Sequence, residues 1–142
     1  MAWFFNKAKT NYMSEMREYV KSFMLEYINE FPTSSDIVIP IFSDAELMIR
    51  GLSEKELSKM MRVNHVNVEC GALNIIQNFA MNKMEPKSGV DFLMSNDNHA
   101  YDLYKYVNKY KYNRGYITKQ QFDENELLAT KISLQSPLGG WF

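Results

Sequence analysis

Two short clusters of side chains in this sequence have the residue types of a metal site. His65 and Glu69 are four residues apart, so a helix would place both on one face. Asp97, His99 and Asp102 form the second cluster, in which His99 and Asp102 are three residues apart. Neither cluster completes the ligand set of a zinc site without a residue from elsewhere in the chain. Surface positions and helix capping explain both clusters, and we expect no bound metal.

The sequence signatures of catalysis are also missing. The chain has no glycine-rich phosphate loop, no nucleophile elbow and no paired cysteine spacing. Its one cysteine, Cys70, stands beside Gly71 and is interpreted as a small buried residue. We therefore expect a non-catalytic protein without a cofactor.

A basic stretch rich in tyrosine lies in the second half of a helix that is predicted to end near Tyr112. Its candidate contacts to nucleic acid are Lys105, Lys109, Lys111, Arg114, Tyr106 and Tyr110. A site for single-stranded nucleic acid needs cations that contact the phosphates and aromatic rings that stack on the bases. An amphipathic helix with half-buried tyrosines and snorkelling lysines predicts the same pattern. The small basic content of the rest of the chain favours this second interpretation.

Residues 57–69 resemble a helix-turn-helix, the motif in which a second helix enters the major groove of DNA. Residues 57–61 would form the first helix, residues 62–64 the turn, and residues from His65 onward the reading helix. The positions at which the motif buries apolar residues are occupied by Leu57, Met61, Val63 and Val68. The segment departs from the motif at Arg62, where a glycine is common, and its reading helix begins without a cation for phosphate. Two short helices packed within a bundle predict the same pattern.

Hydrophobic periodicity predicts an all-α fold. The clearest helix covers residues 11–31, where apolar side chains recur at steps of three and four. The chain is divided into five or six helices by Pro32, Gly51, Pro86, Gly115 and Pro137. Short connections favour antiparallel neighbours in a compact bundle. The predicted core contains Met16, Val20, Phe23, Ile28, Leu57, Met61, Leu73, Ile76, Phe79, Val107 and Leu128.

One segment departs from the helical pattern. Residues 37–41 form an apolar run in which Pro40 cannot donate to a central strand, so we expect at most one short extended segment there. Three capping boxes predict helix starts at Ser43 with Glu46, at Ser53 with Glu56, and at Thr118 with Gln121. Residues 1–134 are expected to form a single helical domain, followed by an arm.

Composition places the chain among folded proteins of one-domain size. It has 142 residues, of which 46% are hydrophobic and 14% aromatic. Its net charge of −1 offers no whole-molecule attraction to nucleic acid or anionic lipid. A lone cysteine fits a reducing compartment, and no apolar run approaches the roughly 20 residues of a membrane span. We expect a cytoplasmic protein without membrane contact, or one in the host cytoplasm or virion if it is viral.

The arm, residues 135–142, reads Q-x-x-L-x-x-W-F. This pattern resembles the short peptide by which replication and repair proteins dock onto sliding clamps of the PCNA type. The resemblance implies that Gln135 enters a small polar pocket of the clamp. It also implies that an apolar pocket is filled by Leu138, Trp141 and Phe142. The alternative is that the two aromatic residues pack on the chain's own core.

Three functions follow from these patterns. The first is an accessory protein that docks on a sliding clamp in replication, repair or clamp-coupled transcription. The second is a virion or connector subunit of phage type, because both ends of the chain are aromatic and suggest contact with a partner or another copy. These ends contain Trp3, Phe4 and Phe5, and Trp141 and Phe142. The third is a helix-turn-helix regulator that binds DNA.

Overall fold

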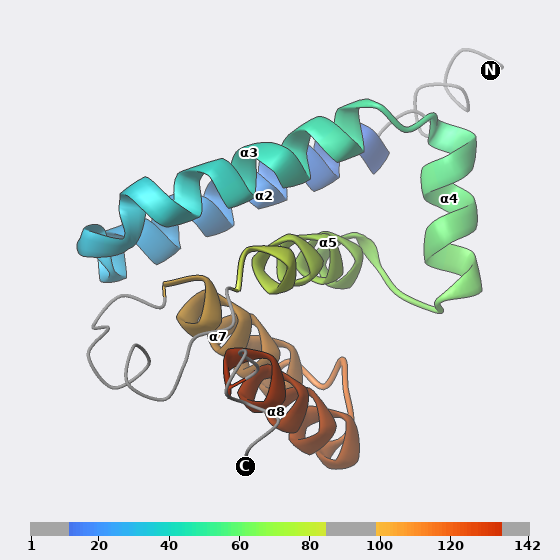
Figure 1. Cartoon of the computed structure of the whole chain (residues 1–142). Helices are drawn as coiled ribbons and strands as arrows, with labels where there is room; N and C mark the ends of the chain where they lie inside the picture. The colour runs from blue at the N-terminus through green and yellow to red at the C-terminus, as the bar shows by residue number, and fades with distance from the viewer. Residues whose placement is uncertain (1–11, 85–98, 135–142) are drawn as a thin grey trace, which may run out of the picture. The chain divides into compact units, whose positions relative to one another are not determined.

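The computed structural model describes residues 12–84 and 99–134, and these ranges are almost entirely helical (Figure 1). The elements are α2 (Tyr12–Glu30), the 3-10 helix η1 (Pro32–Ser34), α3 (Ser35–Arg50), α4 (Glu54–Val63), α5 (Val68–Lys83), α7 (His99–Asn113) and α8 (Lys119–Leu134). The all-α prediction is confirmed, and the two ranges contain no strand. Within them, no helix is both long enough and apolar enough to cross a membrane.

The chain divides into two units, residues 1–76 and 77–142, and α5 runs across the division. The first unit contains α2, η1, α3, α4 and the first turns of α5. The second contains the end of α5 together with α7 and α8. The expectation of a single domain over residues 1–134 stays a prediction.

In the first unit, α2 and α3 form an antiparallel pair, and η1 reverses the chain between them (Figure 1). The buried residues of α2 are Met16, Val20, Phe23 and Tyr27, at the spacing of one helical face. Those of α3 are Val38, Ile41, Phe42, Ala45 and Ile49, again at helical spacing. The ring centroids of Phe23 and Phe42 are 6.1 Å apart. This aromatic contact joins the two apolar faces into the core of the unit.

Residues 37–41 lie in α3, so the expectation of an extended segment there is wrong. Pro40 inside a helix removes one backbone hydrogen bond and crowds the preceding turn, at a cost of about 3 kcal/mol. Burial of the α3 face outweighs that cost, because burying one large apolar side chain contributes about 1.5–3 kcal/mol. Exposed Ile37 and Ile39 flank buried Val38. In the sequence, these three residues form the same kind of apolar run as a strand.

Two of the three predicted capping boxes are confirmed. Ser53 Oγ accepts a hydrogen bond from Glu56 N at 3.1 Å, and Glu56 Oε1 accepts one from Ser53 N at 3.3 Å. At the start of α8, Thr118 Oγ1 accepts from Gln121 N at 3.1 Å, and Gln121 Oε1 accepts from Thr118 N at 2.8 Å. Each box satisfies two backbone donors that have no partner within the helix, which fixes where the helix begins.

The third predicted box is wrong, because Ser43 lies in the interior of α3, which ends at Gly51 as predicted. Glu46 instead accepts hydrogen bonds from Arg17 Nε at 3.0 Å and Arg17 Nη2 at 2.8 Å. It also accepts one from Arg50 Nη2 at 3.0 Å. The hydrogen bond from Arg17, and next that from Arg50, hold the pKa of Glu46 below its ordinary value. Glu46 therefore ties α2 to α3.

In the second unit, α7 and α8 form another antiparallel pair. α7 ends in a Schellman motif, in which Tyr116 N donates to Lys111 O at 2.9 Å and Gly115 N donates to Tyr112 O at 3.0 Å. Gly115 has φ of 76°, a left-handed conformation that glycine adopts without a steric penalty. The predicted helix end at Gly115 is therefore confirmed.

A buried asparagine joins α7 to α8. The side chain of Asn108 is fully buried, and its Nδ2 donates to Phe122 O at 3.1 Å and to Glu126 Oε1 at 3.2 Å. Its Oδ1 accepts a hydrogen bond from Asn125 Nδ2 at 2.9 Å. Because a buried amide without partners is costly, these hydrogen bonds favour one register between the two helices.

Most of the predicted core residues are buried, namely Met16, Val20, Phe23, Leu57, Met61, Leu73, Ile76 and Val107. Ile28 and Phe79 are only partly buried. Leu128 is 42% exposed, so its assignment to the core is wrong. Ala129, one residue further on, is buried, and one residue corresponds to about 100° around a helix.

Candidate functional site

The clamp-binding pattern lies outside the described residues, and its members are Gln135, Leu138, Trp141 and Phe142. The element that precedes it is α8, which ends at Leu134. On α8, the side chains of Leu127 and Leu128 are 56% and 42% exposed. The last turns of α8 therefore offer apolar surface shortly before the pattern begins.

The basic stretch on α7 is divided between two faces of the helix. Lys105 and Lys109 are four residues apart and share a face. Lys105 Nζ lies 3.7 Å from Glu126 Oε2 and 5.3 Å from the centre of the Tyr101 ring. Lys111 points elsewhere, and only 5% of it is exposed. In this structure Lys111 therefore offers little surface to an approaching phosphate.

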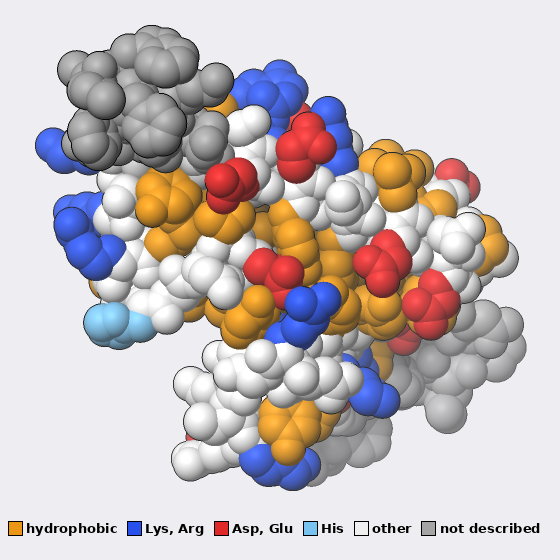
Figure 2. All heavy atoms as spheres, turned by 180° about the vertical axis from the view of Figure 1, so that it is seen from behind, with side chains coloured by type: hydrophobic (Ala, Val, Ile, Leu, Met, Phe, Trp, Pro, Cys, Tyr) orange, Lys and Arg blue, Asp and Glu red, His pale blue; other side chains and the backbone are white. Residues whose placement is uncertain are grey.

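The other members of the basic stretch contact one another. The rings of Tyr106 and Tyr110 are stacked, with centroids 6.4 Å apart and planes at 26°. The guanidinium carbon of Arg114 lies 4.9 Å from the centre of the Tyr110 ring, and the guanidinium donates a hydrogen bond to the Tyr110 hydroxyl. These contacts run along one helix between rings and cations of the same stretch. They match the alternative interpretation, an amphipathic helix with half-buried tyrosines. On the face drawn in Figure 2, basic and acidic side chains are interspersed among hydrophobic ones.

Tyr104 lies on the same helix as the basic stretch and is buried. Burial, and next the negative charge of Glu126, raise the pKa of Tyr104 above its ordinary value. Its phenol therefore keeps its proton at neutral pH. Such a group packs in the core and is poorly matched to proton transfer near neutrality.

The helix pair formed by α4 and α5 has a longer turn than the helix-turn-helix prediction. α4 ends in a Schellman motif, because Val66 N donates to Met61 O at 2.9 Å and His65 N donates to Arg62 O at 3.3 Å. His65 has φ of 53°. The left-handed position, where glycine is common, is therefore held by His65 and not by Arg62.

The predicted start of the reading helix is also displaced. Asn67 caps α5, since its Oδ1 accepts a hydrogen bond from Cys70 N at 2.8 Å, and His65 lies in the turn. Val63, which the motif would bury, is 64% exposed. A Cβ at Gly71 would lie 2.9 Å from Met16 Cε, so α5 packs closely against α2. This arrangement gives the helix-turn-helix interpretation no support.

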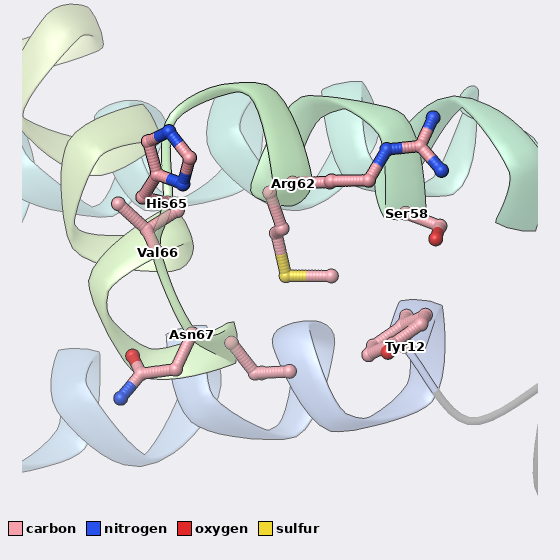
Figure 3. A pocket seen from close by; sticks show the side chains of 8 residues that line it. Tyr12, Ser58, Arg62, His65, Val66 and Asn67 are labelled. Carbon is pink, nitrogen blue, oxygen red and sulfur yellow. The ribbon is translucent and has the colours of Figure 1, made fainter.

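A pocket of about 690 Å³ opens beside this turn, within the first unit (Figure 3). Its polar lining consists of Tyr12, Ser58, Arg62, His65 and Asn67, and its apolar lining of Met61, Val66 and Val68. Arg62 and Ser58 lie toward one end of the pocket with Tyr12 facing them, whereas His65 and Asn67 lie toward the other (Figure 3). The sequence does not reveal this pocket, because its walls come from α2, α4, the turn and α5.

The two clusters of potential metal ligands differ in how far the structure describes them. His65 lies in the turn before α5 and Glu69 in its first turn, so they do not share the face of one helix. His99 and Asp102 lie in the first turn of α7, and Asp97 is outside the described residues. Within the described ranges, no three His, Cys, Asp or Glu side chains gather into a group that could hold a metal ion.

Comparison with protein-family models, with curated proteins and with solved structures found no match to this chain.

Proposed function

We propose that this chain is a non-catalytic interaction protein whose C-terminal residues 135–142 dock onto a DNA sliding clamp. The observation that carries the proposal is the match of these residues to the clamp-binding pattern directly after α8. Exposed Leu127 and Leu128 support it, because they add apolar surface to the helix before the arm. Docking of this kind serves replication, repair or clamp-coupled transcription.

The affinity for the clamp should be modest. An arm that is ordered on binding loses conformational entropy, and Gly139 and Gly140 raise that cost by about 1 kcal/mol each in a helical turn. Two or three buried anchors must offset it. We therefore expect a dissociation constant on the order of 1 μM.

Substitutions in the arm test the proposal with purified components. Isothermal titration of the full chain into a purified clamp should show that Trp141→Ala or Phe142→Ala costs about 2 kcal/mol or more. Ser136→Ala is the matched control, because serine fills no pocket in the pattern, and it should bind like the unaltered chain. Equal affinity of the aromatic variants and the unaltered chain would exclude docking through these anchors.

The clamp itself is identified by affinity capture from the native source. The full chain is compared with a chain that ends at Leu134, so that the two baits differ only in the arm. The full chain should recover the clamp and the shortened chain should not. Recovery of the same proteins by both baits, without a clamp, would contradict the proposal and favour an assembly function.

A second candidate is a structural subunit that acts only through protein–protein contacts, such as a virion or connector subunit. The first unit exposes large apolar side chains away from the arm in sequence, including Leu25 at 65%, Leu47 at 57% and Val63 at 64%. Surface of this kind favours contact with other chains when it forms a continuous patch. This function predicts self-association.

A further inference from the structure

We propose that the pocket beside α4 binds a phosphate monoester that carries a compact apolar group. The site is separate from the C-terminal arm. Its walls belong to one unit, since all eight lining residues lie between Tyr12 and Val68. Its volume of about 690 Å³ is in the usual range for small-molecule sites.

One end of the pocket is suited to a phosphate. Ser58 and Arg62 are four residues apart on α4, so the hydroxyl and the guanidinium stand on one helical face. Tyr12, at the start of α2, faces them with its phenol ring (Figure 3), and this residue is 37% exposed. A guanidinium fork with hydroxyls beside it can satisfy several oxygens of one phosphate.

The charge of the lining has a single sign. Arg62 is its fixed charge, and no Asp or Glu is among the eight lining residues. Among the residues that the structure describes, the side chains of Arg62, Ser58 and Tyr12 have no hydrogen bond or ion pair. A cation that no neighbouring carboxylate neutralises is available to a ligand, in contrast to Arg17, which is held by Glu46.

The rest of the pocket is suited to an apolar body. Met61, which is 5% exposed, lines it together with the partly buried Val66 and Val68. Met61 is on α4, Val66 is in the turn, and Val68 begins α5. A ligand with its phosphate at Arg62 would therefore cover them with an aromatic or aliphatic group and remove apolar surface from water.

Phenyl phosphate is the probe that tests this site. Titrated into the isotope-labelled full chain at low salt, it should shift the backbone amide resonances of residues 62–68, with a dissociation constant on the order of 1 mM. Arg62→Gln should weaken this binding about tenfold, because it removes charge-assisted hydrogen bonds. Ser58→Ala should also weaken it. Circular dichroism should show an unchanged fold, since the Arg62 side chain is exposed and makes no hydrogen bond or ion pair in the described part of the chain.

Lys59→Gln is the matched control. Lys59 is an exposed cation on the same helix, but it does not line the pocket, so its loss should leave binding unchanged. Equal weakening by Lys59→Gln and Arg62→Gln would overturn the proposal, because it would show attraction by charge alone. Resonance shifts confined to other residues would overturn it too. Benzyl alcohol binding as tightly as phenyl phosphate would exclude an anionic head, and tighter binding of benzoate would exclude a phosphate head.

Discussion

At the scale of single residues, the Schellman motifs that end α4 and α7 differ in the residue that takes the left-handed position. Gly115 holds it after α7, with φ of 76°, whereas His65 holds it after α4, with φ of 53°. A residue with a Cβ pays roughly 1–2 kcal/mol for this conformation. The helix end at His65 is therefore strained, and the one at Gly115 is not.

Opposite substitutions at these positions should change stability in opposite directions. His65→Gly should raise the free energy of unfolding by about 1 kcal/mol, because it relieves the left-handed strain. Gly115→Ala should lower it by about 1 kcal/mol through the backbone alone, since a Cβ there meets no atom within 4 Å. Urea unfolding followed by circular dichroism measures both. A destabilised His65→Gly variant would show that the imidazole contributes more than the strain costs.

At the scale of elements, α2 and α3 are held together by their apolar faces and by a small network of ion pairs. Arg17 on α2 and Arg50 on α3 both donate to Glu46, whose side chain is 21% exposed. The pKa of Glu46 is lowered by these hydrogen bonds, so ionised Glu46 favours the folded state. That contribution is present above the unfolded-state pKa of about 4.3 and is lost as the pH falls through the folded-state pKa.

Glu46→Gln should therefore lower the unfolding midpoint at pH 7, and its difference from the unaltered chain should shrink below about pH 4. Thermal melts across this pH range measure the effect. Glu18→Gln is the control, because Glu18 is an exposed carboxylate on α2, the partner helix of α3, and makes no ion pair with a described residue. It should behave like the unaltered chain at every pH. A Glu46→Gln difference that persisted at pH 3 would exclude the charge as its cause.

At the scale of the whole molecule, the exposed apolar side chains of the first unit bear on the assembly function. If that function holds, light scattering should give a mass of at least twice the 16.7 kDa of one chain. Leu25→Ser and Leu47→Ser together should then shift the protein toward the monomer without loss of helix, because both side chains are exposed. A monomer that does not associate at high concentration would contradict the assembly function and favour clamp docking over it.

Short-range signals in the sequence determined much of the secondary structure. The stripe on α2, the capping boxes at Ser53 and Thr118, and the end of α7 at Gly115 are all readable from neighbouring residues. Each depends on contacts within one or two helical turns, so the local sequence contains the information. The clamp-binding pattern is likewise a property of residues 135–142 alone.

Only the tertiary structure decided which residues those elements bury. α3 includes Pro40 because its apolar face is covered by α2, and that burial outweighs the lost hydrogen bond. The exposure of Leu128 and the burial of Lys111 likewise depend on how α7 and α8 pack, which no local pattern states. The pocket around Arg62 could not be predicted from the sequence, because it too depends on how separate elements pack. Its walls come from residues up to 56 positions apart, from Tyr12 to Val68, and folding alone brings them together.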